Sequence, residues 1–476
     1  MRDILRRAVL AGAAALLPCF AQAATEIHMM WYSDGNEGDV IADLLGRFEQ
    51  ANPDIKVVLD RVPYKTINEN LPTLVSSGQA PDMARITDLG GQTDYYLDLG
   101  PLLKDKADWE KNFASVLPWV RPTGNTTGIF GLPTQLTVTM PIVNTTLFQQ
   151  AGIPLPGAKA TWDDWAKAAK AVAQKTNTPI PIAFDRSGHR IAGLAISMGA
   201  KFFDADGKPE LSDDGFKTAM KMLYDWHRDG VMSKQIWGSV GGASYRGANE
   251  EFSNGQVVMY FSGNWQFPQF AKTVGNGFDW QGVTEPCGPA ACTGMPGGAF
   301  LVAYKSTKHP QEVARVMDYL ASGPVYEEYH ARTLFLTASA GLAGLSVKAA
   351  HLATAWHGLE SSYRALLAAD PENIEAPAWT GLAETAAKEA DAAAREGIPY
   401  KSDLPQVQKS LSAASDNVKA LSPLAYRLQG YRYNRILFNA MIVRLNQAIA
   451  GEMSLDDALA RMNQDVADGL KAQGVK

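Results

Sequence analysis

A strand–helix–strand pattern near the start of the chain is the feature that most constrains its fold. Residues 26–32 are apolar and rich in β-formers, and a polar, glycine-containing loop follows them. Apolar residues then recur at helical spacing over residues 40–48, Asp39 is placed to cap this helix, and Asn52-Pro53 ends it. Residues 55–59 supply the second strand. Two strands joined by a helix form parallel neighbours with helices on the sheet faces, so we predict an α/β fold.

Length and charge narrow the choice further. The chain has 476 residues, about three times a typical domain of ~150, which favours two lobes. Hydrophobic residues make up 46% and charged residues 20%, which excludes a disordered chain, a collagen and a coiled coil. The formal net charge of −6 argues against sequence-independent electrostatic binding of nucleic acid. No internal repeat and no long linker is evident, so we expect the lobes to be joined by several short crossings.

The N-terminal segment has the pattern of a secretory signal peptide. Arg2, Arg6 and Arg7 form a basic region, residues 8–17 are apolar, and Ala21-Gln22-Ala23 fits a small-x-small cleavage site. We expect cleavage after Ala23 and export to the periplasm. Beyond this segment no apolar run approaches the ~20 residues that a membrane helix needs, so we predict a soluble mature chain.

Two details of export stay open. Cys19 raises the question of lipidation, although Pro18 directly before it makes a poor lipobox. Arg6-Arg7 also fits a loose twin-arginine pattern, so the sequence does not separate that export route from the general one.

The cysteines predict one disulfide. Three cysteines in 476 residues rule out a disulfide-built scaffold. Cys287 and Cys292 remain after signal cleavage, and exported proteins meet an oxidising compartment. The alternative is half of a metal site, but no histidine or second cysteine pair lies near them in the sequence. We therefore predict a disulfide that stiffens one loop.

Helix signals recur later in the chain. Thr161-Trp162-Asp163-Asp164 is a capping box that opens a helix. Residues 435–449 form an amphipathic helix that Gly451 ends, and Ser454-x-x-Asp457 caps the next one. Residues 340–420 are rich in Ala, Glu and Lys and read as helix-forming.

No catalytic or metal signature stands out. The seven histidines are scattered, with no HExxH, no GxSxG elbow and no phosphate-binding glycine loop. Asp204-x-Asp206-Gly207 hints at a calcium loop, but its twelfth position is Gly215 instead of Glu, so we predict a hairpin turn. We expect no cofactor and no metal. Paired carboxylates are common enough that composition alone leaves a glycosidase open.

A set of dispersed motifs lies in order along most of the chain. The motifs are Phe48-Glu49-x-x-Asn52-Pro53-x-Ile55-x-Val57, Gly78-Gln79-Ala80-Pro81-Asp82, Gly131-Leu132-Pro133, Asn144-Thr145-Thr146-Leu147-Phe148-x-x-Ala151-Gly152-Ile153, Thr161-Trp162-Asp163-Asp164, Phe252-x-x-Gly255-x-x-x-Met259, Gly263-x-Trp265 and Pro296-Gly297-Gly298. Each is weak alone. Their order, together with the signal peptide, resembles the carbohydrate-binding family of solute-binding proteins of ABC importers, which includes maltose-binding protein.

The chain departs from this family in two places. The family often carries an aromatic residue just before the asparagine of the first crossing, where this chain has Val143. The helical segment near residues 345–415 is longer than expected, which leaves the third crossing poorly placed.

The resemblance implies a two-lobed periplasmic-binding-protein fold, type II-like, with a ligand cleft between lobes joined by about three crossings. Residues 24–135 and 303–350 would form lobe 1, and residues 136–302 and 351–476 would form lobe 2. The family captures solute by hinge closure and delivers it to membrane permease subunits, without breaking a bond. We expect a monomer that binds no nucleic acid.

Sugar recognition needs aromatic faces and fixed hydrogen-bonding groups. The resemblance and the predicted strand ends together select Trp265, Trp31, Tyr32, Asp34, Arg85, Thr87, Asp88, Gln135, Gly297, Gly298 and Arg332. Trp265 is the leading platform, with Gly263 leaving the approach open. Alternatives remain for each type: a core position for Trp265, a loop cap for Asp34, a plain turn for the glycines, and exposed salt bridges for the arginines.

The ligand class is the least constrained part. We expect a neutral mono- or oligosaccharide. An acidic sugar or a glycerol-phosphate-like solute is the alternative if Arg85, Arg186, Arg190, Arg246 and Arg332 line the cleft, because guanidinium forks match anionic groups. Two other classes are kept open: an exported carbohydrate-active enzyme, and a scaffold or chemoreceptor partner without transport.

Overall fold

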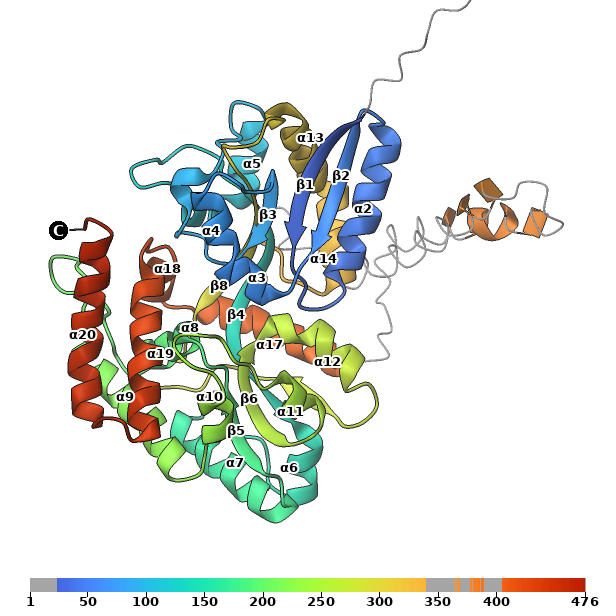
Figure 1. The fold of residues 1–476 in the computed structure, drawn as a ribbon. Helices are drawn as coiled ribbons and strands as arrows, with labels where there is room; N and C mark the ends of the chain where they lie inside the picture. Colours follow the sequence, from blue (N-terminus) through green and yellow to red (C-terminus); the bar gives the residue numbers. More distant parts are fainter. Residues whose placement is uncertain are drawn as a thin grey trace, which may run out of the picture.

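The chain folds into two lobes that share one mixed sheet (Figure 1). The structure is a computed structural model that describes residues 24–339 and 405–475, with short helical pieces between 364 and 388. The strand order is β2-β1-β3-β8-β4-β6-β5, and β7 pairs with β4 outside this path. The predicted signal peptide and most of the predicted helical segment at 345–415 lie outside the described residues.

Lobe 1 begins with the predicted strand–helix–strand unit. Its parallel strands are β1 (Thr25–Trp31), β2 (Ile55–Arg61) and β3 (Met83–Ile86), with α2 (Glu37–Ala51) between the first two. The expected helix cap is wrong: Asn36 holds the N-cap position without a side-chain bond, and Asp39 in the first turn accepts from Arg61 at 2.7 Å. The other helices of this lobe are α3 (Tyr64–Glu69), α4 (Leu71–Ser76), α5 (Lys106–Phe113), α13 (Pro310–Ala321) and α14 (Gly323–Thr333).

Lobe 2 is built around β5, β6 and β7. These strands span Ile180–Phe184, Val257–Gly263 and Trp280–Gly282. The helices are α6 (Thr145–Ala151), α7 (Trp162–Thr176), α8 (Gly188–Ser197), α9 (Asp214–Arg228), α10 (Lys234–Gly238), α11 (Asn249–Ser253), α12 (Phe267–Thr273), α17 (Pro405–Ala420), α18 (Pro423–Gln429), α19 (Asn434–Ala450) and α20 (Leu455–Ala472).

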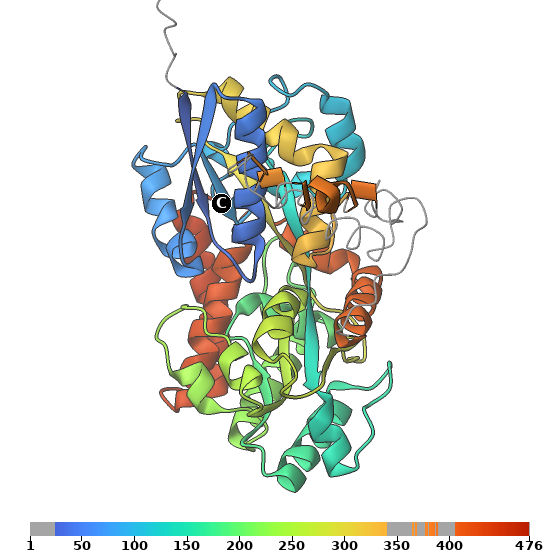
Figure 2. The same ribbon diagram turned by 90° about the vertical axis from the view of Figure 1, so that its right-hand side faces the viewer.

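Two strands carry the chain between the lobes. β4 (Leu132–Asn144) is 13 residues long, pairs with β8 (Pro296–Ala303) over its first half, and pairs with β6 and β7 over its second half. Figure 2 shows β4 running from one lobe into the other. Each lobe has its own hydrophobic core, and residues 299–303 pack in that of lobe 1. The exact lobe limits stay a prediction, and the third crossing leads toward residues outside the described part.

Several local predictions are confirmed. Thr161 and Asp164 form the capping box of α7, Ser454 caps α20, and Gly451 ends α19 with a φ of 79°. Asp204 bonds two backbone N–H groups of a tight turn. Cys287 and Cys292 form a disulfide. Among the described residues, no helix has both the length and the apolar character that crossing a membrane requires.

Candidate functional site

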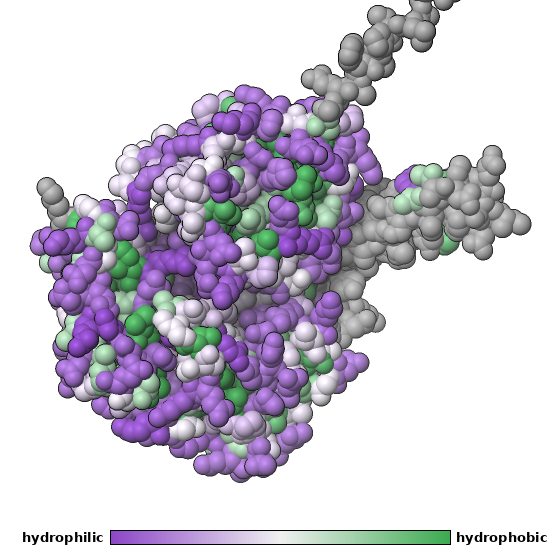
Figure 3. All heavy atoms as spheres, viewed as in Figure 1, coloured by the Kyte–Doolittle hydropathy of each residue, from purple (hydrophilic) through white to green (hydrophobic). Residues whose placement is uncertain are grey.

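A cleft of about 1220 Å³ lies between the lobes, and both contribute to its walls. The space-filling view shows the molecule hollowed there, with hydrophilic residues along much of the rim (Figure 3). Residues that follow the carboxyl ends of β1, β2 and β3 reach it from lobe 1, and residues that follow β5 and β6 reach it from lobe 2. Strand ends of α/β sheets are where such folds place ligands.

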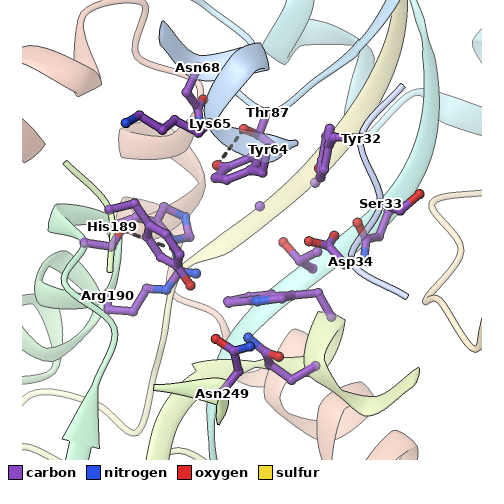
Figure 4. Close-up of a pocket in the computed structure, with 18 of the residues that line it drawn as sticks. Tyr32, Ser33, Asp34, Tyr64, Lys65, Asn68, Thr87, His189, Arg190 and Asn249 are labelled. Atoms are coloured by element: carbon purple, nitrogen blue, oxygen red, sulfur yellow. Dashed lines mark hydrogen bonds between the residues drawn. The ribbon is translucent and has the colours of Figure 1, made fainter. Parts of the chain in front are cut away.

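The lobe 1 wall presents two tyrosine rings. Tyr32 follows β1 and packs against Tyr64 of α3, with 4.9 Å between ring centroids. The hydroxyl of Tyr64 is 3.0 Å from Oγ1 of Thr87, which follows β3 (Figure 4). Burial raises the pKa of the Tyr32 phenol well above its usual value, so this ring stays neutral. The wall offers apolar ring surface next to a hydroxyl pair.

Beneath this wall lies Arg85, which is fully buried. Its guanidinium donates to the Tyr32 carbonyl at 2.8 Å, to Glu37 at 3.0 Å and to Gln135 at 2.7 Å. Arg85 therefore supports the wall, and does not take the direct ligand contact that the sequence predicted. Trp31 is likewise fully buried and lies outside the cleft lining. Strand alternation explains Trp31, which lies on the same buried face of β1 as Ile27 and Met29. Arg85 is buried because β3 is covered on both faces, so that all four of its residues are buried.

Asp34 reaches the cleft from the loop after β1. Its side chain is 25% exposed, and its carboxylate is 3.8 Å from Arg85. Burial, strengthened by the nearby Glu37 carboxylate, raises the pKa of Asp34 to about 7. The loop itself is held by Glu37, which accepts from the backbone N–H groups of Asp34 and Gly35. The alternative of Asp34 as the loop cap is therefore not what the structure shows.

The lobe 2 wall carries Trp265, which is half-buried at the end of β6. The expectation that Gly263 leaves room for a ligand is wrong, because the Trp265 ring itself fills that room: a Cβ at position 263 would lie 1.8 Å from a ring carbon. The guanidinium carbon of Arg190 lies 4.3 Å from the ring centroid. Trp265 and Arg190 thus form a cation–π pair on this wall, and the role of the ring as a ligand platform stays a prediction.

Arg190 is held by a buried carboxylate. Its Nε and Nη2 donate to Asp185 at 3.2 and 3.1 Å. Asp185 is fully buried and also accepts from Ser262 at 2.7 Å and from the Tyr260 hydroxyl. Burial raises the pKa of Tyr260 well above its usual value, so its hydroxyl remains a donor. The network fixes Arg190 in one orientation.

A second pair of rings spans the cleft. Tyr245, on the loop before α11, meets Tyr64 of lobe 1 edge-to-face with 6.0 Å between centroids. Arg186 holds the Tyr245 loop by donating to the carbonyls of Ser244 and Gly242, both at 2.6 Å. Arg186 lines the cleft but serves to position this loop.

The floor of the cleft is formed where the paired strands β4 and β8 pass from one lobe to the other. Gln135 is buried there, and its Nε2 has no partner among the described residues. Gly297 and Gly298 pack closely against β4, because a Cβ on Gly297 would lie 2.7 Å from Oγ1 of Thr137 and a Cβ on Gly298 would lie 2.5 Å from the Gln135 carbonyl oxygen. His189 bonds the Pro296 carbonyl at 2.9 Å, and burial lowers its pKa to about 3.

Several charged residues near the rim form ion pairs within the chain. Asp88 of lobe 1 bonds Arg435 of α19 at 2.9 Å, which joins the lobes. Arg332 pairs with Glu328 at 3.0 Å and with Asp43. Arg246 pairs with Glu251 and does not line the cleft. For Arg332 the salt-bridge alternative therefore describes its state in this structure.

The structure brings most of the selected residues to one cleft. Those that line it are Trp265, Tyr32, Asp34, Thr87, Asp88, Gln135, Gly297, Gly298 and Arg332. Whether each contacts a ligand stays a prediction. Other residues that line the cleft were not predicted from the sequence: Tyr64, Tyr245, His189, Gln266 and the α19 residues Asn434, Arg435 and Phe438. Tyr64 and His189 follow the ends of β2 and β5, so the strand-end argument used for β1 and β3 would have found them.

The chemistry offered is binding chemistry. Aromatic faces alternate with a carboxylate, amides, hydroxyls and a fixed guanidinium, which suits a ligand with apolar faces and many hydroxyl edges. Over residues 24–339 and 405–475 no group of three or more His, Cys, Asp or Glu side chains is arranged as metal ligands.

Comparisons with known proteins agree with this geometry. Residues 33–324 match the family model described as bacterial extracellular solute-binding protein. The chain is 24% identical over 260 residues to the arabinooligosaccharide-binding protein of Bacillus subtilis, and the match covers 53% of this chain and 58% of that relative. The chain thus spans less than two thirds of the relative's length.

Solved structures show the same fold. An ABC substrate-binding protein from Listeria monocytogenes, in complex with cycloalternan, superimposes with a TM-score of 0.69 at 16% identity and covers 95% of this chain and 100% of its own. The maltose/maltodextrin-binding domain from Bdellovibrio bacteriovorus, bound to maltotriose, gives a TM-score of 0.66 at 14% identity over 94% and 100% of the two chains. The predicted two-lobed fold is confirmed.

Proposed function

The chain belongs to the bacterial extracellular solute-binding protein family, and from that membership we propose that it captures a sugar or oligosaccharide and delivers it to an ABC permease. The observation that carries the proposal is the composition of the cleft. Rings from both lobes, Tyr64 and Tyr245 among them, face hydrogen-bonding groups across one cavity. Pyranose rings present the matching combination of C–H faces and hydroxyl edges.

A neutral ligand fits the charges better than an acidic one. Arg85, Arg190, Arg246 and Arg332 each pair with a carboxylate of this chain. Both terminal nitrogens of Arg186 donate to loop carbonyls, those of Ser244 and Gly242. The positive charge of each of these four paired arginines is therefore balanced by a carboxylate within the protein.

Capture proceeds by closure of the lobes about β4 and β8. A ligand that shifts closure from 1:99 to 99:1 needs ~5.5 kcal/mol of differential affinity. A micromolar ligand binds with ~8 kcal/mol in total, so ordinary contacts suffice. Contacts already span the cleft at Tyr64–Tyr245 and at Asp88–Arg435, on which a ligand can build.

The setting of this activity is also proposed. Residues 1–23 direct export, the mature chain works in the periplasm, and the disulfide between Cys287 and Cys292 suits that compartment. The sugar leaves unchanged, since relatives such as the Bacillus subtilis protein are binding proteins. ATP hydrolysis belongs to a separate subunit of the importer.

Thermal denaturation against maltotriose, arabinotriose, digalacturonate and glycerol 3-phosphate tests the proposal. A ligand at 100 times its Kd adds ~2.7 kcal/mol to the free energy of unfolding, which gives a clear rise in Tm. Chromatography of the recovered sugar should show no product, and small-angle scattering should show compaction. Absence of any shift with the neutral sugars, or sugar cleavage, would count against it.

A further inference from the structure

Two opposite charges face the same part of the cleft from different lobes. The side chain of Arg190 is 13% exposed and that of Asp34 is 25% exposed, and both line the cavity. Figure 4 shows them on opposite sides of it. No ion pair joins them in the described part of the chain, where Arg190 pairs with Asp185. Each therefore keeps hydrogen-bonding capacity for something between them.

Arg190 is a donor with a fixed direction. A guanidinium carries five N–H groups. Asp185 takes two of them, and Oγ of Ser187 lies 3.4 Å from Nη1. No described residue accepts from the other two donors, and Arg190 lines the cleft. Because the guanidinium also lies over Trp265, a sugar unit at this platform comes within reach of these donors.

Asp34 is the matching acceptor. Its loop is held by Glu37, and Arg85 beneath it keeps a cation 3.8 Å from the carboxylate. Neither contact uses all the lone pairs of the carboxylate, which accepts up to about four hydrogen bonds. A hydroxyl group both accepts and donates, so it is the group that satisfies Arg190 and Asp34 together.

We propose that Arg190 and Asp34 form a donor–acceptor clamp on the hydroxyls of one neutral sugar unit at Trp265, with Asp185 as the positioning residue of Arg190. The inference rests on the proposed function and adds the two residues that determine specificity, Arg190 and Asp34. Asp34 is ionised at pH ~9, about two units above its pKa of about 7, and the calorimetric titrations that test the clamp are run at that pH. A ligand carboxylate would then meet repulsion from Asp34, and a ligand ammonium would meet repulsion from Arg190. The clamp therefore selects uncharged, hydroxylated ligands, and it binds their hydroxyls from both lobes at once.

Calorimetric titration of the full mature chain tests the clamp, with maltotriose and arabinotriose as neutral probes and digalacturonate as the acidic one. Arg190→Lys keeps the charge but loses the fork, and Asp34→Asn keeps the shape but loses the charge. Each should weaken binding of the tighter neutral probe about ten- to a hundredfold. The double variant should be no weaker than the worse single variant, because both residues read the same hydroxyls. Arg228→Gln, an exposed arginine of α9, is the matched control and should bind like wild type.

Two further readouts separate binding from folding. Asp185→Asn should weaken the neutral probe like Arg190→Lys and add nothing in the Arg190→Lys background, while melting curves show that the variants are folded. Asp34→Asn should raise the affinity for digalacturonate relative to the neutral probe by about tenfold or more. A charge repulsion equivalent to one pKa unit corresponds to a factor of ten in an equilibrium constant.

Unchanged affinity in Arg190→Lys overturns the clamp. So do single effects that multiply in the double variant, because they would show two independent contacts. In both cases wild type still binds sugar, and the proposed function stands. Wild type that binds neither neutral probe overturns the proposed function, and the clamp falls with it.

Discussion

The two walls of the cleft carry the same pair of charges in reverse order. Lobe 1 buries its cation, Arg85, and presents its carboxylate, Asp34. Lobe 2 buries its carboxylate, Asp185, and presents its cation, Arg190. The buried Asp185 holds Arg190 in place by accepting two hydrogen bonds. The buried Arg85 supports Asp34 by its charge, 3.8 Å away, and its Nε has no hydrogen-bond partner among the described residues. A charged residue near a site therefore supports the wall when the fold buries it, and faces the cleft when its partner is the buried one.

Removing the buried charge of lobe 1 should give the largest effect. Arg85→Met leaves the fully buried Glu37 carboxylate without its cation, which costs about 3–5 kcal/mol of the free energy of unfolding. Asp185→Asn in lobe 2 should cost less, because the Arg190 it leaves reaches water at the cleft. Urea unfolding measures both. An equal or larger loss of stability in Asp185→Asn would contradict this difference between the two lobes.

Asp34 should make stability depend on pH. Its folded pKa of about 7 is raised by burial and by Glu37, and opposed by Arg85 and Arg190, so the folded chain holds a proton that the unfolded chain has lost. Stability therefore falls as pH rises from ~4 to ~7. Asp34→Asn removes this dependence and should gain about 1–3 kcal/mol over wild type at pH ~8, since water at the cleft weakens the full shift.

The control for this titration lies far from the cleft. Arg315 lowers the pKa of the exposed Asp54, so Asp54→Asn should change the pH dependence in the opposite direction. Urea midpoints measured across the pH range would contradict the assignment if both variants moved the same way.

Trp265→Ala should lower ligand affinity more than stability. Loss of an aromatic platform costs about 1–3 kcal/mol of binding, a ten- to hundredfold rise in Kd, by analogy with bases stacked on aromatic rings. Trp109→Phe in the lobe 1 core is the control that should bind normally. A large drop in Tm for Trp265→Ala, with full affinity in the folded fraction, would assign the ring to the core.

The contact between the lobes at the rim should matter least. Asp88→Asn removes the ion pair with Arg435, whose partners are 20% and 41% exposed. We expect a loss of about 0.2–1 kcal/mol that vanishes near 1 M salt. Urea unfolding at low and high salt checks this. A salt-independent loss would show that the pair is desolvated.

The sequence predicted what local patterns determine. The strand–helix–strand opening, the cap of α7 and the end of α19 depend on neighbours within a few residues, and the structure confirms them. The ordered motifs led to the correct fold because they mark turns and helix starts along the whole chain. Strand ends and one motif predicted Tyr32, Asp34 and Trp265 as cleft residues, and all three line the cleft.

The roles of the arginines could not be read in the same way. Arg85 pairs with Glu37, 48 residues away, and only the fold shows that both are fully buried. Tyr245 sits on a loop with no regular pattern, placed by carbonyls that bind Arg186. Arg190 had a usable signal, since it follows the end of β5 by one turn and lies five residues after Asp185.

The interleaving of the two cores has a consequence for biosynthesis. The lobe 1 core includes both Leu132 and Ala299, and lobe 2 is threaded between them. The N-terminal half of lobe 1 must therefore wait for about 170 more residues, roughly ten to thirty seconds of translation, before its core can close. Lobe 2 in turn needs Leu437 and Met462 from the last helices. Neither lobe can therefore complete its core until most of the chain has been synthesised.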